Sequence, residues 1–426
     1  MEHLKREDFP VSGQETIIFS KKKYPRYVNG VPNDATVNTG SPSDVTTNDD
    51  VVIEITPRSF SSGVRLFVLC FVTVLFNVIM NVSLPVFAGT MEYVGGGMFA
   101  LLLYGALYYP FVLGGLTLFL KVTVDKSLTL YPTCRWRVYL VMGLTTTLNG
   151  VGVVFASPPS RTAPYLQGVL ATIIIPFTVL CRLVLLRKGI SLRRLGCTLA
   201  VLVGIFITIE PQIWSLPGSG NESAGGSTTA HVIWPMIFAL GFLPAAINTV
   251  VCERELKQAE AQSLSFITWT QMFQLLTILP LFWVDFIPFF GMAKSFGDFS
   301  HRLNRGFGCN FSSADDCHGL AYKGWIFILG YCLANLFQFL LIQKAEGAIF
   351  AVVVQSMTTP LATLFWTFFK FDVPSDRFYW DPEFTETTGF TVGGLVMIVP
   401  AVILYNLFSK WDAQEAKKTE ENSENE

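Results

Sequence analysis

Residues 160–186, SRTAPYLQGVLATIIIPFTVLCRLVLL, decide the fold class of this chain. A turn rich in Pro and Ser opens the stretch, and no charged residue follows between Thr162 and Cys181. A helix rises about 1.5 Å per residue, so an apolar stretch of this length crosses the roughly 30 Å of hydrocarbon in a bilayer. The stretch therefore predicts a transmembrane helix.

This helix also carries polar groups and a proline, namely Gln167, Thr172 and Pro176. A proline inside a spanning helix frees a backbone carbonyl that protein, rather than lipid, must satisfy. A related pattern, AVVVQSMTTPLATLFWTFF, returns at residues 351–369. There the polar residues and the proline are Gln355, Ser356, Thr358, Thr359 and Pro360. Two polar, proline-containing helices in corresponding parts of the chain indicate a substrate path between two repeats.

The composition is that of a polytopic membrane protein. The 426 residues are 51% hydrophobic and 15% charged, and the mean hydropathy is +0.46, whereas soluble domains carry about 25% charged residues. A net charge of -2 without a basic stripe excludes nucleic acid as a partner. The four His and eight Cys lack metal-ligand spacing, so we expect no metal and no cofactor. Catalytic motifs such as HExxH, GxSxG and Walker A are absent, so we do not expect an enzyme.

Ten uncharged stretches predict an all-α integral membrane protein of ten transmembrane helices. They occupy residues 66–91, 93–120, 138–160, 162–181, 195–209, 232–251, 261–284, 324–343, 347–369 and 387–409. Five helices per half give the halves opposite orientations, so the chain is expected to form two inverted five-helix repeats. The expected organisation is a disordered tail (1–57), a first repeat (58–214), a loop (215–230), a second repeat (231–411) with a long loop (291–323), and a charged tail (412–426).

The distribution of Lys and Arg predicts the orientation in the bilayer. The connections on the side of the tails are rich in Lys and Arg, whereas the first three connections on the other side hold only Arg161. Because positive charge marks the cytosolic side, both tails are expected in the cytosol. Two glycosylation sequons, at Asn221 and Asn310, then lie on the far side. Cys309 and Cys317 share that side, where an oxidising compartment favours a disulfide, the alternative being two free thiols.

A set of amide and hydroxyl side chains lies inside the predicted helices. Any one of them could serve only to hold helices together, but as a set they predict a wet, neutral cavity for a small-molecule substrate. The candidate substrate-binding residues are Asn77, Asn81, Gln167, Thr172, Asn248, Gln271, Asn335, Gln338, Gln355 and Ser356. A neutral polar cavity suits a zwitterion, an amide-rich peptide or an organic cation.

Charged residues are absent from the middle of every predicted span. Without a mid-membrane Lys or Arg, a phosphate-bearing substrate is disfavoured, and Arg182 lies near a helix end, where it can extend to the interface. Two acids, Glu210 and Asp285, lie toward the far side and are candidates for proton coupling. The alternative for Glu210 is an interfacial helix cap without a transport role.

Several stretches resemble the chloroquine resistance transporter-like family of the drug/metabolite transporter superfamily. The resemblance covers about residues 60 to 410, and its main stretches are SRTAPYLQGVLATIIIPFTVLCRLVLLRKGISLRRLGCTLAVLVGIFITIEP, FALGFLPAAINTVVCERELK, TWTQMFQLLTILPLFWV, RGFGCNFSSADDC and VVVQSMTTPLATLFWTFF. The positions that match are Asn81, Gln167, Pro176, Glu210, Gln355 and Pro360. The long loop departs from the pattern in having two Cys where some members have four, and Val82 stands where a matching lysine would lie next to Asn81.

The resemblance implies a secondary transporter with a central cavity in a vacuolar or lysosomal membrane. It further implies proton-linked export of amino acids, peptides or cationic drugs toward the cytosol, while some plant-like relatives serve plastids and thiol peptides. We therefore expect alternating access in an endomembrane, with a small solute, protons and the lipid bilayer as partners. The alternatives are a nucleotide-sugar or thiol-peptide carrier of the same superfamily, a channel, and a receptor-like membrane protein.

Overall fold

The computed structural model describes residues 60–124, 126, 128–186, 191–213, 228–258, 262–344, 348–382 and 386–424. All of them belong to the unit Arg58–Glu426, and the expected N-terminal tail at 1–57 lies outside the described residues. Asn221 and most of the expected loop at 215–230 also lie outside them, although residues 228–230 already belong to a helix. The fold below is that of the described residues.

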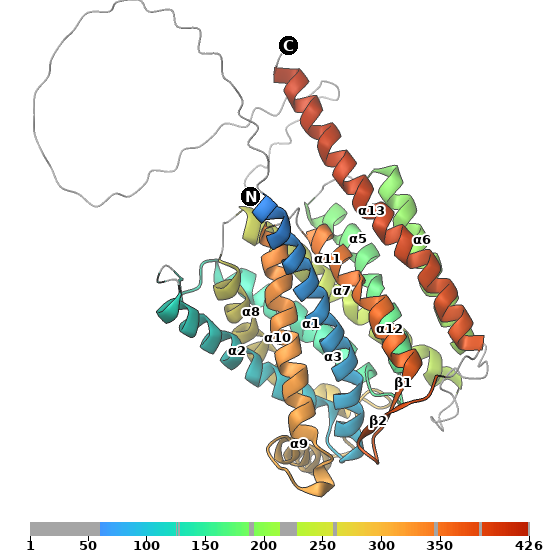
Figure 1. The fold of residues 1–426 in the computed structure, drawn as a ribbon. Coiled ribbons are helices and arrows are strands. Elements are labelled where there is room, and N and C mark those ends of the chain that lie inside the picture. The colour runs from blue at the N-terminus through green and yellow to red at the C-terminus, as the bar shows by residue number, and fades with distance from the viewer. Residues whose placement is uncertain are drawn as a thin grey trace, which may run out of the picture. The chain divides into compact units, whose positions relative to one another are not determined.

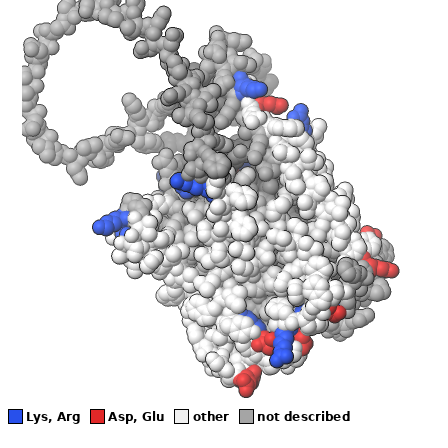
Figure 2. Space-filling model, viewed as in Figure 1, with Lys and Arg blue, Asp and Glu red and all other residues white. Residues whose placement is uncertain are grey.

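Nine stretches of the described residues are helical, long enough and apolar enough to cross a membrane, which confirms the predicted all-α membrane fold at that level. They are α1 (Phe60–Tyr93), α2 (Met98–Thr123), α3 (Trp136–Ala156), α4 (Pro164–Leu170) with α5 (Ile174–Leu186), α7 (Thr228–Gln258), α8 (Ser263–Ile278) with η2 (Leu279–Phe286), α10 (Leu320–Lys344), α11 (Ala348–Ser356) with α12 (Thr358–Phe368), and α13 (Glu386–Glu424). The expected fifth helix is α6 (Leu192–Ile213). On the face drawn in Figure 2, charged side chains gather near the helix ends and leave the described surface between them uncharged.

Helices far apart in the sequence pack side by side. α1 packs along α10, α3 along α7, α2 along α8, and α6 along α13, as Figure 1 shows for the last pair. Glycines permit two of these contacts: a Cβ on Gly152 would lie 2.8 Å from the Cα of Gly241, and a Cβ on Gly394 would lie 2.7 Å from the carbonyl oxygen of Gly204. Small residues of this kind let helix backbones approach closely in a membrane.

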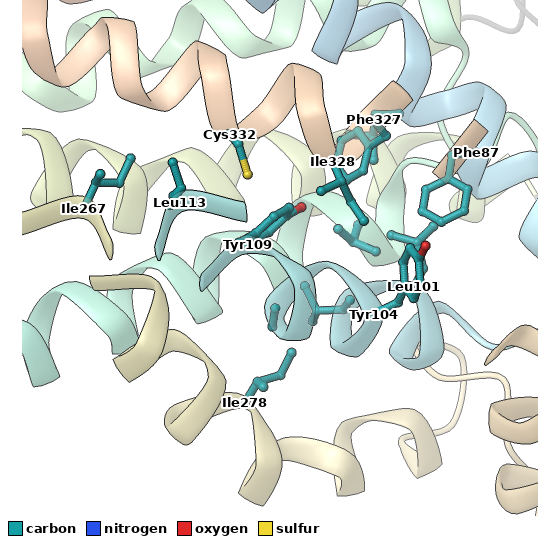
Figure 3. Close-up of a cluster of buried hydrophobic side chains, with 14 of the residues drawn as sticks. Phe87, Leu101, Tyr104, Tyr109, Leu113, Ile267, Ile278, Phe327, Ile328 and Cys332 are labelled. Carbon is teal, nitrogen blue, oxygen red and sulfur yellow. The ribbon is translucent and has the colours of Figure 1, made fainter. Parts of the chain in front are cut away.

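Two apolar cores fill the bundle. The larger core joins α1, α2, α3, α8 and α10, and Figure 3 shows Tyr109 and Leu113 of α2 against Ile328 and Cys332 of α10. The smaller core joins α4, α5, α6, α7 and α13. Lipid tails are as apolar as these side chains, so the cores stabilise the bundle mainly through close packing rather than through removal of surface from water.

The connections hold more structure than the sequence predicted. The loop expected at 291–323 contains α9 (Phe296–Asn310), whose N-cap Ser295 accepts a hydrogen bond from the Asp298 backbone N–H at 3.2 Å. A β-hairpin of β1 (Phe369–Asp372) and β2 (Arg377–Trp380) follows α12. In the sequence KFDVPSDRFYW, aromatic residues flank a turn, a pattern that favours a hairpin.

The last helix extends beyond its predicted end. α13 continues through Glu424, although helix 387–409 was expected to stop before a charged tail at 412–426. The segment after Pro400 contains no further Pro or Gly and is rich in Ala, Glu and Lys, so nothing in it stops a helix. The described part of this segment is therefore helical.

A cavity between two broken helices

The helix that opened the sequence analysis is broken near its middle. α4 ends at Leu170, one 3-10 turn, η1 (Ala171–Ile173), follows, and α5 begins at Ile174. Pro176 is the third residue of α5 and has no N–H to donate to the carbonyl of Thr172, four residues earlier. The helix therefore has a turn at η1 that lacks the regular backbone hydrogen bond from residue 176 to the carbonyl of Thr172.

The second proline-containing helix is broken in the same way. α11 ends at Ser356 and α12 begins at Thr358, so Met357 separates them. Pro360 is the third residue of α12 and cannot donate to the carbonyl of Ser356. The proline has the same position after each break, although the residues around it differ.

The two breaks face one cavity. Its lining comes from α1, from the α4–η1–α5 helix and from the α11–α12 helix, and consists of Asn81, Gly168, Ala171, Thr172, Ile174, Gln355, Ser356, Thr358 and Thr359. The empty space, including the part open to solvent, is about 320 Å³. None of these lining residues carries a charge. The structure thus brings together four predicted substrate residues: Asn81, Thr172, Gln355 and Ser356.

Amide groups on α1 and α11 determine which atoms face this cavity. The Nδ2 atom of Asn81 donates to the backbone carbonyl of Asn77 at 2.8 Å. The Nε2 atom of Gln355 donates to the Oδ1 atom of Asn77 at 3.1 Å, and Gln355 Oε1 has no partner among the described residues. One N–H group of each amide nitrogen is thus engaged by protein, and Gln355 Oε1 is an acceptor with free capacity for a solute.

Two hydroxyl groups of the cavity donate to the backbone. Thr172 Oγ1 donates to the carbonyl of Val169 at 2.7 Å, and Thr359 Oγ1 donates to the carbonyl of Gly168 at 3.0 Å. The hydroxyl of Thr358 is buried without a partner among the described residues. Since a hydroxyl has one proton and two lone pairs, a hydroxyl that donates to the backbone can only accept from a solute.

Two predicted substrate residues instead hold the backbone. Gln167 is buried, and its Nε2 atom donates to the carbonyls of Ser157 and Thr162 at 2.7 and 2.8 Å, which fixes the turn between α3 and α4. The Nδ2 atom of Asn248 donates to Thr146 Oγ1 at 2.8 Å and joins α7 to α3. Neither residue lines the cavity.

Three further predicted residues lie on α8 and α10, away from the cavity lining. Gln271 of α8 and Gln338 of α10 are buried. The Nδ2 atom of Asn335 donates to the carbonyl of Tyr331 in its own helix at 2.9 Å. The predicted set is therefore divided between the cavity and the contacts that hold helices together.

The two candidate acids have different surroundings. Glu210 has an exposed side chain on α6, whereas Asp285 is 1% exposed and its Oδ1 atom accepts from the Met292 backbone N–H at 3.1 Å. Arg182, expected to extend to the interface, instead pairs with Glu253 of α7 at 3.1 Å. The reason is that α5 packs along α7 and brings the carboxylate within reach.

One end of the bundle carries α9, the hairpin and the Cys309–Cys317 disulfide, and we call it the disulfide end. The disulfide confirms the predicted pairing of these cysteines. Asn310, a predicted glycosylation site, is 1% exposed, and its Nδ2 atom donates to the carbonyl of Gly306 at 2.8 Å. A glycan on this buried nitrogen does not fit the folded chain.

The surroundings of two cations at the disulfide end escaped the sequence prediction. Arg161 donates to the carbonyls of Phe155 and Phe290 at 2.6 and 3.2 Å and lies 4.1 Å from the ring centre of Trp234. Burial lowers the pKa of this guanidinium from its ordinary value. Lys323, the second cation of this end, is buried at 4% exposure, whereas Arg161 is partly buried.

Four cavity residues without amide groups were not in the predicted substrate-binding set, although the sequence had marked Thr358 and Thr359 as polar residues of a helix on the substrate path. Gly168 and Ala171 leave the space into which α12 packs, and Thr358 and Thr359 follow the break in α11–α12. Their signal was present, because all four lie within a few residues before or after a break marked by Pro176 or Pro360.

Comparisons with known proteins agree with this architecture. The sequence profile of the CRT-like, chloroquine-resistance transporter-like family matches residues 67–405. The chain belongs to this family. Three proteins of Dictyostelium discoideum are similar to this CRT-like chain. Crt homolog 3 is 24% identical over 65% of the chain and 58% of its own length. Crt homolog 1 is 23% identical over 68% of the chain and 66% of its own length. Crt homolog 2 is 23% identical over 71% of the chain and 64% of its own length. The chain thus spans less than two thirds of the length of each.

Proposed function

We propose that this CRT-like chain is a secondary transporter that moves small cationic or zwitterionic solutes across an endomembrane by alternating access. The observation that carries the proposal is the uncharged cavity between two broken helices. In it, the hydroxyl donors of Thr172 and Thr359 and one amide N–H of each of Asn81 and Gln355 are engaged by protein. A cavity lined by acceptor oxygens favours a solute that brings its own N–H donors, such as an ammonium group.

Helix pairing supports an arrangement of ten helices as two inverted repeats at 58–214 and 231–411. In it, α6 is the fifth spanning helix, since its 22 residues would extend about 33 Å. In this arrangement α1 corresponds to α7, α3 to α10 and α5 to α12. The contact of α1 with α10 then has its counterpart in the contact of α7 with α3, and the contact of α5 with α7 has its counterpart in that of α12 with α1. The contacts α2–α8 and α6–α13 map onto themselves. Such symmetry is what two rocking halves require.

The solute class follows from the same lining. Amino acids, peptides and amphipathic cationic drugs all carry ammonium groups, and the family resemblance points to the same classes. A nucleotide-sugar carrier needs a cation to hold phosphate, and the lining residues include none. Alternating access then presents the acceptor oxygens to one side of the membrane at a time.

The orientation that we propose places the disulfide end in the lumen of a vacuole or lysosome, with a plastid as the alternative. Support comes from the disulfide, which is typical of an oxidising compartment. Asn221→Gln should abolish a glycosidase-sensitive mass shift, whereas Asn310→Gln should leave it unchanged because Asn310 is buried. A mass shift lost only in Asn310→Gln would contradict the structural argument, and a C-terminus accessible only from the lumen would contradict the orientation.

We also propose proton coupling through Asp285 in preference to Glu210. Asp285 is buried near Arg161 and Arg302, so rearrangement of these neighbours would change its tendency to hold a proton. Glu210 is exposed on α6. In a pH gradient, Asp285→Asn should flatten the dependence of uptake on the gradient, and Glu210→Gln should retain most of it. The opposite ranking of the two variants would return the role to Glu210.

The transport proposal is tested with the full chain reconstituted in liposomes. Initial uptake of radiolabelled lysine should saturate with concentration, rise with a pH gradient and exceed uptake of glutamate. A channel would instead give a non-saturating flux and a steady conductance. The absence of saturable lysine uptake in vesicles that contain folded protein would overturn the proposal.

A further inference from the structure

We propose that Asn77 determines the charge selectivity of the cavity without contacting the solute. This inference rests on the proposed function and adds a positioning residue to it. Asn77 is 1% exposed on α1 and does not line the cavity, although the sequence predicted it as a substrate-binding residue. Its influence on the solute passes through Gln355 of α11, which does line the cavity.

The first step is the orientation of the Asn77 amide. Its Nδ2 atom lies 2.8 Å from the carbonyl oxygen of Thr73, one turn earlier in α1. A carbonyl only accepts, so the atom that faces it must be the amide nitrogen. The opposite orientation would place two oxygen atoms against each other in a buried site. The backbone of α1 therefore fixes the Oδ1 atom of Asn77 on the side of α11.

The second step transfers this orientation to the cavity. Asn77 Oδ1 can only accept, so Gln355 must present its Nε2 atom, which donates to Asn77 Oδ1 at 3.1 Å. The other end of the Gln355 amide, Oε1, is then left without a partner among the described residues. Gln355 consequently offers the acceptor Oε1 to the solute, while one of its two amide N–H groups is held by Asn77.

Loss of Asn77 would remove this constraint. In an Asn77→Leu variant nothing holds the Gln355 nitrogen against α1, so the amide can turn and present N–H groups to the cavity. Donors attract carboxylates and repel ammonium groups. The variant should therefore lose preference for cations while every lining residue stays in place.

The test measures initial uptake of radiolabelled lysine, glutamine and glutamate by the full chain in liposomes. Asn77→Leu should lower the ratio of lysine to glutamate uptake about tenfold, equivalent to about 1.4 kcal/mol. Asn149→Leu is the matched control, because Asn149 donates to the carbonyl of Gly241 at 2.9 Å between α3 and α7 and does not line the cavity. This control should keep the ratio of the unaltered chain. Asn77→Ala replaces the leucine variant if the latter fails to accumulate, since it removes the acceptor without adding bulk.

A double variant separates the relay from a general loss of structure. In a Gln355→Leu background there is no amide to turn, so Asn77→Leu should change the ratio no further. An unchanged ratio in both Asn77→Leu and Asn77→Ala, with saturable lysine uptake in the unaltered chain, would overturn the relay and leave the transport proposal standing. A tenfold fall that persists in the Gln355→Leu background would also overturn the relay. Failure of the unaltered chain to take up lysine would overturn the transport proposal itself.

Discussion

A buried ammonium at the disulfide end and an amide of the cavity lining differ in how fully the protein around them uses their hydrogen-bonding capacity. At the disulfide end, the Lys323 ammonium pairs with Asp376 at 2.5 Å and donates to the Thr90 hydroxyl at 3.1 Å and the His318 carbonyl at 2.8 Å. In the cavity, the amide oxygen of Gln355 has no partner among the described residues. The satisfied ammonium of Lys323 holds α10 to the hairpin, whereas the unused oxygen of Gln355 belongs to a residue of the cavity lining, where a solute can use it.

The largest expected effect follows from breaking the disulfide end. Lys323→Met would leave the Asp376 carboxylate without its cation and should destabilise the fold by about 3 kcal/mol. Lys370→Met is the matched control, because its pair with Asp381 lies at 3.0 Å with both side chains more than a third exposed, and it should cost at most about 1 kcal/mol. Thermal unfolding in detergent measures both. Equal losses of stability in the two variants would show that burial of Lys323 does not increase the contribution of its ion pair to stability.

An intermediate effect is expected from the two breaks. Pro176→Ala or Pro360→Ala restores an N–H that can bond to the carbonyl of Thr172 or Ser356 and extend the helix through the break. Uptake should fall about tenfold, equivalent to about 1.4 kcal/mol, with protein level unchanged. Pro110→Ala in α2 is the control, since this proline lies outside the cavity lining. Uptake that stays normal at matched protein level would reduce both prolines to packing residues.

The smallest effect concerns an exposed pair at the disulfide end. Arg305 donates to the Asp316 carboxylate at 2.7 Å, which holds the pKa of that carboxyl below its ordinary value. The stabilisation is therefore present above the ordinary carboxyl pKa of about 3.9 and is lost as pH falls through the lower folded value. Asp316→Asn should lower the melting temperature slightly at about pH 6, and the difference should shrink as pH falls below about 3.9. A difference that grows on acidification would contradict this sign.

The sequence predicted the membrane fold because long uncharged stretches have few alternative structures. It also predicted the disulfide and singled out the two prolines beside which the helices break, since each depends on local features of the chain. It did not separate Gln355 from Gln167, because both are amides in spanning helices. Only packing shows that Gln167 holds a turn while Gln355 faces the cavity.

The burial of Lys323 and the hairpin were also beyond prediction. Lys323 stands one turn inside α10, where a sequence predicts exposure at the interface, but the hairpin after α12 carries Asp376 to it. The pairing depends on a contact between segments more than fifty residues apart, and no local pattern encodes it. The ion pair of Arg182 and Glu253 between α5 and α7 likewise joins segments far apart in the sequence.

The central claim is that the cavity between the broken helices is the path of the solute. Protection of an introduced cysteine tests it most directly. Asn81→Cys places a thiol in the cavity lining. Asn248→Cys places one outside the lining, at the residue that joins α7 to α3. Both variants are reconstituted and treated with a small methanethiosulfonate, and the unaltered chain gives the baseline for the native cysteines. Lysine should slow the modification of Asn81→Cys in a concentration-dependent way. The modification rate of Asn248→Cys should not change. Saturable lysine uptake without any protection of Asn81→Cys would contradict the account.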